Sequence, residues 1–302
     1  MSDDMQTDAM LAEALGQLLA THCTPAVVRQ IELEAQAGGA NAALGPAAAA
    51  LWQTLEDSGF ADALVPEAHG GAGLTLAQAF PLFALSGRCV LPLPLPAVMV
   101  ARAWCASQGL PQPEIATNKV AVHAYLTRAM PGFGEQNVRH LHASLVAAQM
   151  AGALQAVLAM TLQYANDRQQ FGRPIGKFQA IQHQLAVMAE QALAAGMAAQ
   201  LGCSQALPSL PLAPEPLNAA VAKARASEAA VEVAALAHSI FGAIGFTAEH
   251  DLQLFTRRLH QWRQEGGSES HWHDQLGAHL VLQHAGTTLD ALRTLTDLPA
   301  GV

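Results

Sequence analysis

The segment from Tyr164 to Met188 constrains the fold of this chain more than any other, because it contains the end of one helix and the start of the next. Helix-forming residues continue to Arg168, a short turn with glycine and proline follows, and helical spacing resumes at Phe178. Glycine favours the end of a helix, and proline cannot continue one. We therefore predict two long helices, over residues 135–168 and 178–205, which a tight corner makes antiparallel neighbours.

Most of the remaining sequence also has the spacing of helices. Apolar residues recur every three or four positions between residues 8 and 57, which predicts three helices before the glycine at position 59. Further helices are expected over residues 76–86, 97–107, 217–241, 249–264 and 273–295. Long antiparallel helices with alanine and glycine at their contacts are typical of a four-helix bundle, so the second half of the chain is predicted to be one.

Residues 109–134 interrupt the helical pattern. One or two short strands are expected between Lys119 and Leu126, among several prolines and glycines. A hairpin alone is marginally stable, so this segment is predicted to pack on the helices as a linker. The expected organisation is an N-terminal helical domain over residues 1–108, a linker over 109–134 and a C-terminal helical bundle over 135–302.

The composition limits the partners that the protein can have. Apolar residues make up 51% of the 302 residues and charged residues only 13%, which indicates that part of the apolar surface is buried against other subunits. The net charge of -9 argues against a nucleic acid or an anionic membrane as partner. The longest apolar run, Ala143 to Met160, contains two glutamines and is interpreted as a buried bundle helix.

The cysteines and the N-terminus indicate the compartment. The cysteines are widely spaced, without a Cys-x-x-Cys pair, at Cys23, Cys89, Cys105 and Cys203. Buried free thiols in a reducing cytosol explain this spacing best. The acidic N-terminus lacks the basic and apolar regions of a signal peptide, so a cytoplasmic protein is expected.

Two stretches carry a resemblance to a known family. The turn from Arg168 to Phe178 and the glycine-containing stretch from Ser239 to Gly245 resemble the acyl-CoA dehydrogenase family, flavoenzymes that desaturate acyl-CoA thioesters. The Gly-Phe, Val-Pro-Glu and Gly-Gly sequences between residues 59 and 74 look like the N-terminal helical domain of this family. The resemblance implies a mainly α fold. It also implies that the middle β-domain, which normally stands between the two helical domains of the family, is largely missing here.

In the family, this corner reaches across a subunit interface to hold FAD. The residues of this chain that match cofactor-contacting positions of the family are Arg168, Gln170, Phe171, Ile175, Phe178, Ser239, Gly242 and Ala243. A guanidinium at position 168 can pair with a pyrophosphate, and the ring of Phe171 can cover a cofactor ring. Ser239 and Ala243 replace a glutamine and a glycine of the family pattern. Without the resemblance, Arg168 would serve the last carbonyls of its helix, and the glycines would serve a tight turn.

The chemistry of the family needs a carboxylate that removes the α-proton while hydride leaves to the flavin. The two family positions for this carboxylate fall at His142 and at or next to Gly266, and neither residue is acidic. Glu265 and Glu249 are the remaining candidates for a catalytic base. The histidines near the C-terminus lack a metal-ligand motif, so no metal site is predicted.

These observations leave three hypotheses. The first is an FAD-dependent acyl-CoA dehydrogenase that acts as one subunit of a heteromer, as in family members that pair a complete subunit with a reduced one and act on steroid-CoA thioesters. A full-length partner then brings the β-domain and the base, although a homo-oligomer also stays open. The second is a structural subunit that binds no flavin. The third is an enzyme that acts on acyl-CoA without flavin, for example by hydration, through Glu249 or Glu265.

Overall fold

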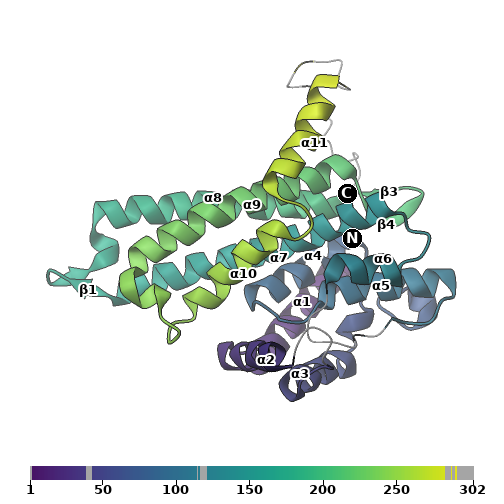
Figure 1. Cartoon of the computed structure of the whole chain (residues 1–302), viewed down its shortest axis with the longest axis horizontal. Helices are drawn as coiled ribbons and strands as arrows, with labels where there is room; N and C mark the ends of the chain where they lie inside the picture. Colours follow the sequence, from purple (N-terminus) through teal and green to yellow (C-terminus); the bar gives the residue numbers. More distant parts are fainter. Residues whose placement is uncertain are drawn as a thin grey trace.

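Helices form almost all of the regular structure. The computed structural model describes residues 2–38, 43–113, 115, 121–282, 287 and 290, and these confirm the mainly α fold (Figure 1). The helices are α1 (Ser2–His22), α2 (Pro25–Ala37), α3 (Pro46–Asp57), α4 (Leu76–Arg88), α5 (Leu95–Gln108), α6 (Val122–Ala129), α7 (Glu135–Asp167), α8 (Gln179–Ser204), α9 (Pro216–Phe241), α10 (Leu252–Gln264) and α11 (Glu269–Leu282). The short 3-10 helices are η1 (Phe60–Asp62), η2 (Glu67–His69), η3 (Ile175–Lys177) and η4 (Gly242–Phe246). The strands form two hairpins, β1 (Gln169–Gln170) with β2 (Arg173–Pro174) and β3 (Ala206–Leu207) with β4 (Leu210–Pro214).

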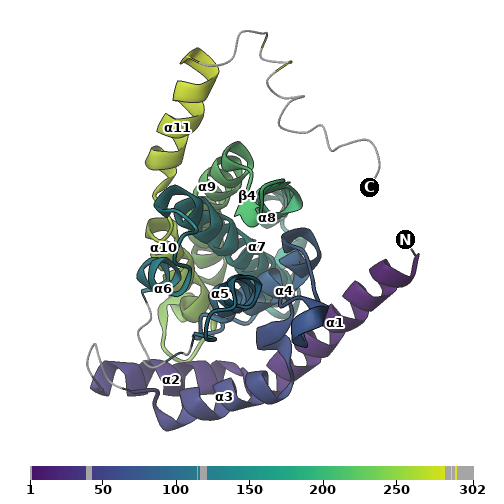
Figure 2. The same ribbon diagram turned by 90° about the vertical axis from the view of Figure 1, so that its right-hand side faces the viewer.

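Helix α7 forms the centre of the bundle. It contacts α8, α9, α10 and the N-terminal helix α4, so other helices surround it (Figure 2). Its middle part, from Leu141 to Leu154, is buried almost completely. A helix that is buried all round needs apolar residues on every face, which explains the long apolar run in this part of the sequence.

Two helical stretches, Glu135–Asp167 and Pro216–Phe246, are long and apolar enough to cross a membrane by length and composition. In the first stretch, 67% of the most apolar part is buried inside the molecule. In the second stretch, the buried share of the most apolar part is 44%. Core helices of a bundle meet the same test, because other helices surround them as lipid would. Helix packing therefore accounts for both stretches.

The N-terminal helices join the bundle where α4 crosses α7. Gly87 of α4 and Gly152 of α7 bring the two backbones into contact. A Cβ atom at Gly152 would overlap the carbonyl oxygen of Ala84, and a Cβ atom at Gly87 would overlap that of Gln149. Only glycine permits this approach, and the crossing merges the buried residues of both halves into one hydrophobic core.

An ion-pair cluster and a helix cap order the remaining N-terminal elements. Arg102 of α5 is buried and donates to the carboxylates of Glu56 in α3 and Asp62 in η1. Thr75 caps the start of α4, because its hydroxyl accepts from the N–H of Gln78 and the Gln78 side chain accepts from the N–H of Thr75. Helices α1, α2 and α3 thereby form a layer on one side of the bundle (Figure 2).

The segment between the two helical halves differs from the prediction. Residues 122–126, expected in a strand, belong to the helix α6, while residues 119–120 lie outside the described residues. The apolar residues Val122, Tyr125, Leu126 and Ala129 have the helical spacing i, i+3, i+4 and i+7 and pack against the core. The strand prediction was wrong because the apolar period here is that of a helix.

Most of the other predicted boundaries agree with the structure. The helices expected over residues 135–168 and 178–205 are α7 and α8. The loop after α8 contains the hairpin β3–β4, which its prolines did not lead us to expect. Helices α10 and α11 begin at Leu252 and Glu269, within four residues of their predicted starts. The expected extension of the last helix to residue 295 lies outside the continuously described part of the chain.

The substitution Gly152→Ala is expected to destabilise the fold, because the added methyl group forces the backbones of α4 and α7 apart. We expect the free energy of unfolding to fall by about 1–3 kcal/mol, the usual cost of overpacking a core. Gly277→Ala in α11 is the control, since a Cβ atom there meets nothing within 4 Å. The control should leave stability unchanged or raise it slightly. Urea unfolding followed by circular dichroism measures both variants, and equal losses would contradict the backbone contact.

Candidate functional site

The β1–β2 hairpin extends from one end of the bundle, at the left of Figure 1. Gln169–Gln170 pairs with Arg173–Pro174, so Phe171 and Gly172 form the turn. Both turn residues have a positive φ, 50° for Phe171 and 78° for Gly172. This is the pattern of a type I′ hairpin turn. Glycine adopts it easily, whereas for phenylalanine it costs on the order of 1–3 kcal/mol.

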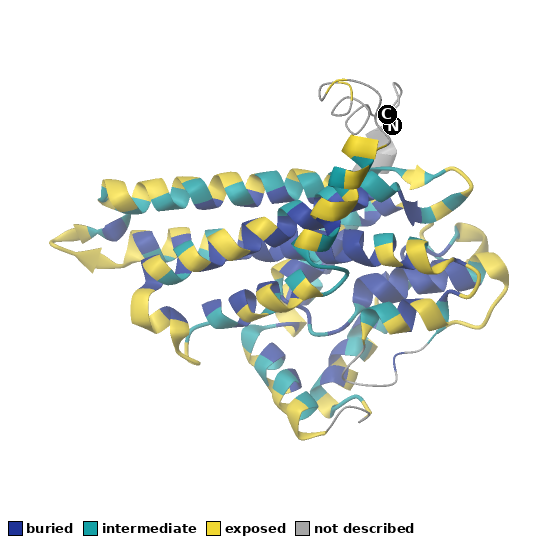
Figure 3. Cartoon of the chain, turned by 45° about the horizontal axis from the view of Figure 1, so that its top comes forward, coloured by how far each residue is buried: buried dark blue, intermediate teal, exposed yellow. Residues whose placement is uncertain are grey.

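Phe171 presents its ring outward from this turn. The residue is 92% exposed, and its ring meets that of Phe178 edge-on with 6.1 Å between the centroids. Figure 3 shows the whole hairpin as an exposed extension of the bundle. An exposed aromatic ring in a strained backbone conformation does little to stabilise its own chain, so it points to a contact with another molecule.

Three cations, Arg168, Arg173 and Lys177, belong to the same tip. The guanidinium of Arg173 lies 4.3 Å from the centroid of the Phe178 ring. Arg168 and Lys177 are exposed, and neither forms an ion pair with a carboxylate of the described residues. In a chain with a net charge of -9 this tip is a local basic region, suited to phosphate or carboxylate oxygens.

The end of α9 lies beside the base of the hairpin. Gln184, near the start of α8, donates from Nε2 to Oγ of Ser239 at 3.5 Å. Tyr164, near the end of α7, stacks on Phe241 with 4.2 Å between the ring centroids. The fold therefore brings the two stretches that resemble FAD-contacting segments to the same end of the bundle.

The predicted cofactor residues differ in how far they are exposed to solvent. Exposed are Arg168, Gln170, Phe171, Ser239, Gly242 and Ala243, and Phe178 is partly buried. Ile175 is only 7% exposed, and its N–H donates to the carbonyl oxygen of Arg168 at 2.8 Å. Ile175 thus anchors the hairpin in the core of its own chain. A Cβ atom at Gly242 would meet nothing within 4 Å, so the backbone there is open to the outside.

Sequence reasoning missed several side chains at this end, Arg173 and Lys177 among them. It also missed Phe246, which is 70% exposed and stacks on the ring of His238 with 4.2 Å between the centroids. No clear signal for Phe246 was present in the sequence, because other aromatic residues beside glycine, such as Phe60 and Phe133, are buried. Phe246 adds a second exposed aromatic ring to this end of the bundle.

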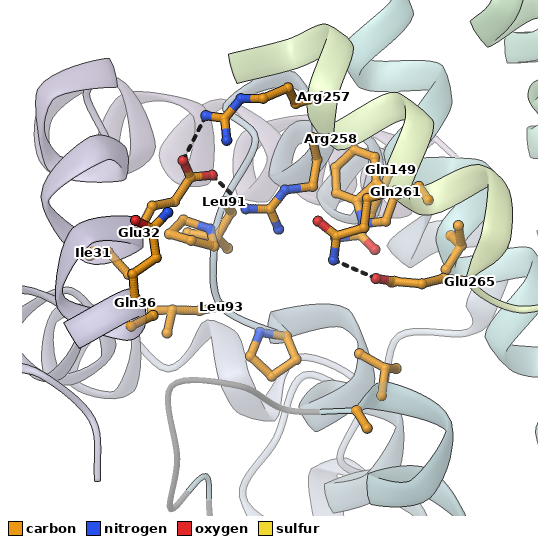
Figure 4. Close-up of a pocket in the computed structure, with 17 residues that line it drawn as sticks. Ile31, Glu32, Gln36, Leu91, Leu93, Gln149, Arg257, Arg258, Gln261 and Glu265 are labelled. Atoms are coloured by element: carbon orange, nitrogen blue, oxygen red, sulfur yellow. Dashed lines mark hydrogen bonds and ion pairs between the residues drawn. The ribbon is translucent and has the colours of Figure 1, made fainter. Parts of the chain in front are cut away.

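The two candidate catalytic carboxylates lie far apart. Glu249 is exposed in the turn before α10, whereas Glu265 directly follows that helix. The 13 residues of α10 separate them by about 20 Å. Glu265 borders a cavity and accepts a hydrogen bond from Nε2 of Gln261 at 2.6 Å (Figure 4). The structure therefore does not combine the two carboxylates in one site.

The neighbouring position, Gly266, disfavours a side chain. Its φ is 67°, and a Cβ atom would lie 3.2 Å from Cα and 3.3 Å from N of Ala143 in α7. Trp272 donates from Nε1 to the carbonyl oxygen of Gly266 at 3.0 Å, which holds the loop against the helix. A glutamate at this position would have to move the loop away from α7.

Lys223 of α9 holds the same loop from the other side and is fully buried. Its ammonium donates to the carbonyl oxygens of Arg263 at 3.0 Å and Gly267 at 2.8 Å, and to Oγ of Ser227 at 2.9 Å. Burial lowers the pKa of Lys223 to about 8, against the opposing effect of Glu269. Lys223 is thus a buried cation that fastens the loop between α10 and α11 to the bundle.

His142 lies in α7 beside this loop and is 3% exposed. Neither ring nitrogen has a hydrogen-bond partner among the described residues. Burial, together with the charges of His123 and Lys223, lowers the pKa of His142 to about 3. The imidazole is therefore neutral at physiological pH and too weakly basic to remove an α-proton efficiently.

These features define a class of protein: a helical bundle with an exposed aromatic and cationic turn at one end. The sequence profile of the family "Acyl-CoA dehydrogenase, C-terminal domain" matches residues 140–280, which include the hairpin. The chain belongs to the acyl-CoA dehydrogenase family.

Curated relatives extend the similarity beyond the bundle. The chain is 30% identical to the acyl-CoA dehydrogenase IpdE2 of Mycobacterium tuberculosis, over 83% of this chain and 90% of the relative. It is also 30% identical to IpdE2 of Mycolicibacterium smegmatis, over 83% of this chain and 91% of the relative. The similarity therefore extends beyond residues 140–280.

Solved structures share the reduced fold. The Tcur3481-Tcur3483 steroid ACAD matches with a TM-score of 0.73 at 19% identity, over 92% of this chain and 98% of that chain. A chain of the ChsE4-ChsE5 complex from Mycobacterium tuberculosis matches with a TM-score of 0.70 at 16% identity, over the same shares. At this identity the matches concern the fold alone. They confirm a helical acyl-CoA dehydrogenase fold in which the β-domain is largely missing.

The burial of His142 predicts an acid-sensitive fold. Folding lowers the pKa of this imidazole from an ordinary value of 6.5 to about 3, so the unfolded state binds more protons between these values. The contribution of the neutral His142 to the free energy of unfolding is complete above pH 6.5. It falls as the pH decreases, by about 2 kcal/mol between pH 7.5 and pH 5. Urea unfolding at both pH values should show this loss, which His142→Gln should remove. His69→Gln, at an exposed histidine, should leave the loss unchanged.

Proposed function

We propose that this chain is one subunit of a heteromeric, FAD-dependent acyl-CoA dehydrogenase, and that its hairpin tip completes the FAD site of a full-length partner subunit. The observation that carries the proposal is Phe171, a 92% exposed ring at positive φ close in sequence to the exposed Arg168, which has no ion pair with the described residues. Neither side chain serves the core of this chain. Together they have the groups that bind a dinucleotide. The phenylalanine ring provides a flat apolar surface, and the guanidinium provides donors for phosphate oxygens.

The residues at this end of the bundle fit FAD. The guanidinium of Arg168 suits the pyrophosphate, and the ring of Phe171 suits a cofactor ring. The hydroxyl of Ser239 and the open backbone at Gly242 and Ala243 offer further hydrogen-bond groups. When bound, FAD supplies the acceptor for the hydride that leaves the β-carbon of the acyl-CoA. The role of this chain is to bind and orient the cofactor.

The catalytic base is proposed to come from the partner. A side chain at Gly266 would be strained by the positive φ and crowded by Ala143, and His142 is buried and neutral. Glu265 borders a cavity, which keeps an acyl-CoA enzyme that works without flavin as a second candidate function. Glu249, exposed and remote from Glu265, has no comparable surroundings.

The related proteins support a heteromer and a steroid-type substrate. One structure is a complex of two named proteins, ChsE4 and ChsE5, and the other is called a steroid ACAD. We propose a steroid-type acyl-CoA thioester as the substrate of the complex that this chain forms, in the cytoplasm.

Co-expression with a full-length acyl-CoA dehydrogenase homologue from the same organism tests the proposal. We expect a stable complex that is yellow after size exclusion, while the chain alone is colourless. Changing both Arg168→Ala and Phe171→Ala should weaken FAD binding to the complex by at least about tenfold, because a charge-assisted pair and a stacking surface are lost. FAD titration of the apo-complex and the ratio of flavin to protein absorbance measure the effect.

Arg139→Ala is the matched control, because Arg139 is also an exposed arginine and lies in α7, near the end of the helix opposite to Arg168. It should leave FAD binding unchanged. A complex that keeps its full flavin content in the double variant would favour a structural subunit. Turnover of an acyl-CoA by the lone, colourless chain, abolished by Glu265→Gln, would favour the enzyme without flavin.

A further inference from the structure

We propose that a cavity between α5 and the β3–β4 hairpin binds an uncharged, apolar molecule with a flat ring system. The cavity has a volume of about 730 Å³. Its walls come from residues between 64 and 75, from the C-terminal part of α5 and from residues 209–212 of the hairpin. This volume lies in the range of ligand sites, and the cavity lies where the two helical halves of the chain meet.

The cavity is distinct from the place proposed for FAD and from the surroundings of Glu265. The 26 residues of α8 separate the β1–β2 hairpin from the β3–β4 hairpin by about 40 Å (Figure 1). The cavity also shares no lining residue with the one that Glu265 borders. The inference therefore goes beyond the proposed function and does not depend on it.

Apolar side chains from both halves of the chain form much of the wall. Leu64 and Leu74 lie on one side, Trp104 belongs to α5, and Leu210 and Leu212 come from β4. The two leucines of β4 are only partly buried. Because apolar surface in contact with water is unfavourable, an apolar ligand that fills the cavity gains free energy by covering this surface.

Several polar groups of the wall already have partners within the chain. Trp104 donates from Nε1 to the carbonyl oxygen of Pro131 at 3.1 Å. Ser107 donates from Oγ to the carbonyl oxygen of Trp104 at 2.7 Å, and the hydroxyl of Thr75 caps α4. A ligand gains little from hydrogen bonds to groups that are already satisfied, so it needs few polar atoms of its own.

Trp104 provides a flat and rigid part of the wall. The bond to Pro131 holds one edge of the indole, and Phe133 meets the ring edge-on with 5.1 Å between the centroids. The residue is only 9% exposed. A ring that is already held in one orientation loses little conformational entropy when a ligand binds, and a flat ligand ring can pack against it.

The β3–β4 hairpin makes the cavity preformed. Leu207 pairs with Leu210, so the turn between them contains Pro208. Pro211 and Pro214 lie within β4, and the ring of each proline fixes its φ angle. The strand β4 also packs on α7. A wall that is rigid before binding reduces the cost of ordering the site around a ligand.

The charges select an uncharged ligand. Glu67 is the one charged residue among the lining residues, and no lysine, arginine or histidine lines this cavity. The Glu67 side chain lies against Gly73, where an added Cβ atom would be 3.5 Å from its Cγ. An anion would meet this carboxylate without a balancing cation. A cation would give up its hydration for a single exposed carboxylate, which compensates little.

Ser107→Trp is designed to fill the cavity from its rim. Ser107 is exposed and lines the cavity, so an indole there takes up the space of the ligand without disturbing the core. Ser58→Trp is the matched control. Ser58 is also exposed at a helix end and donates from Oγ to the carbonyl oxygen three residues earlier, that of Leu55, but it lies outside the cavity lining.

The experiment titrates the purified full chain with N-phenyl-1-naphthylamine and with 8-anilinonaphthalene-1-sulfonate. These fluorescent probes share one aromatic body and differ in a single negative charge. We expect the uncharged probe to bind at least about tenfold more tightly than the sulfonate. Ser107→Trp should weaken its binding at least about tenfold, and Ser58→Trp should leave it unchanged. Equal loss in both variants, or no loss in Ser107→Trp, would overturn the proposal.

Glu67→Gln tests the origin of the charge selection. Removing the carboxylate should strengthen binding of the sulfonate about threefold, as expected for two like charges a few ångströms apart in water. Binding of the uncharged probe should stay the same. A sulfonate that binds as tightly as the uncharged probe to the unaltered chain, or that does not respond to Glu67→Gln, would show that the cavity does not select an uncharged ligand.

Discussion

The direct backbone contact between α4 and α7 is the constraint on which the rest of the structure depends. Gly87 and Gly152 permit it, and it places the N-terminal helices against the bundle. Because α2 then faces α10, Arg29 and Glu32 can reach cations and anions of the bundle half. Glycine brings one pair of helices together, while long charged side chains connect the other pair and leave a cavity between them.

The two ends of the bundle expose different chemistry. At one end the hairpin presents Phe171 and Arg168 to the outside. Near the other end, the loop at Gly266 lies against α7 beside the buried, neutral His142. A chain with this arrangement can contribute groups to a site outside itself without a base of its own. The chain can belong to an enzyme family although neither usual position of the catalytic carboxylate holds an acidic residue. The residues of a site can change while the fold stays the same.

The helices could be predicted because their signals are local. The apolar spacing and the glycine and proline of the corner lie in neighbouring residues, so the predicted ends of α7 and α8 are within one residue of the structure. The helix α6 was missed because its helical spacing covers only eight residues between prolines and glycines. The candidate site was partly predictable for the same reason: Arg168, Gln170 and Phe171 belong to one short turn, whereas the cavity beside Glu265 is lined by five separate segments.

By itself, the sequence determined the order of the long helices and the turn that contains Arg168 and Phe171, because neighbouring residues encode both. Only the tertiary structure decided that Gly266 lies on Ala143 and that His142 has no described hydrogen-bond partner. It also decided that Glu32 meets Arg258, 226 positions away in the chain. Contacts between such distant segments depend on how closely whole helices approach, and no local pattern of residues encodes that distance.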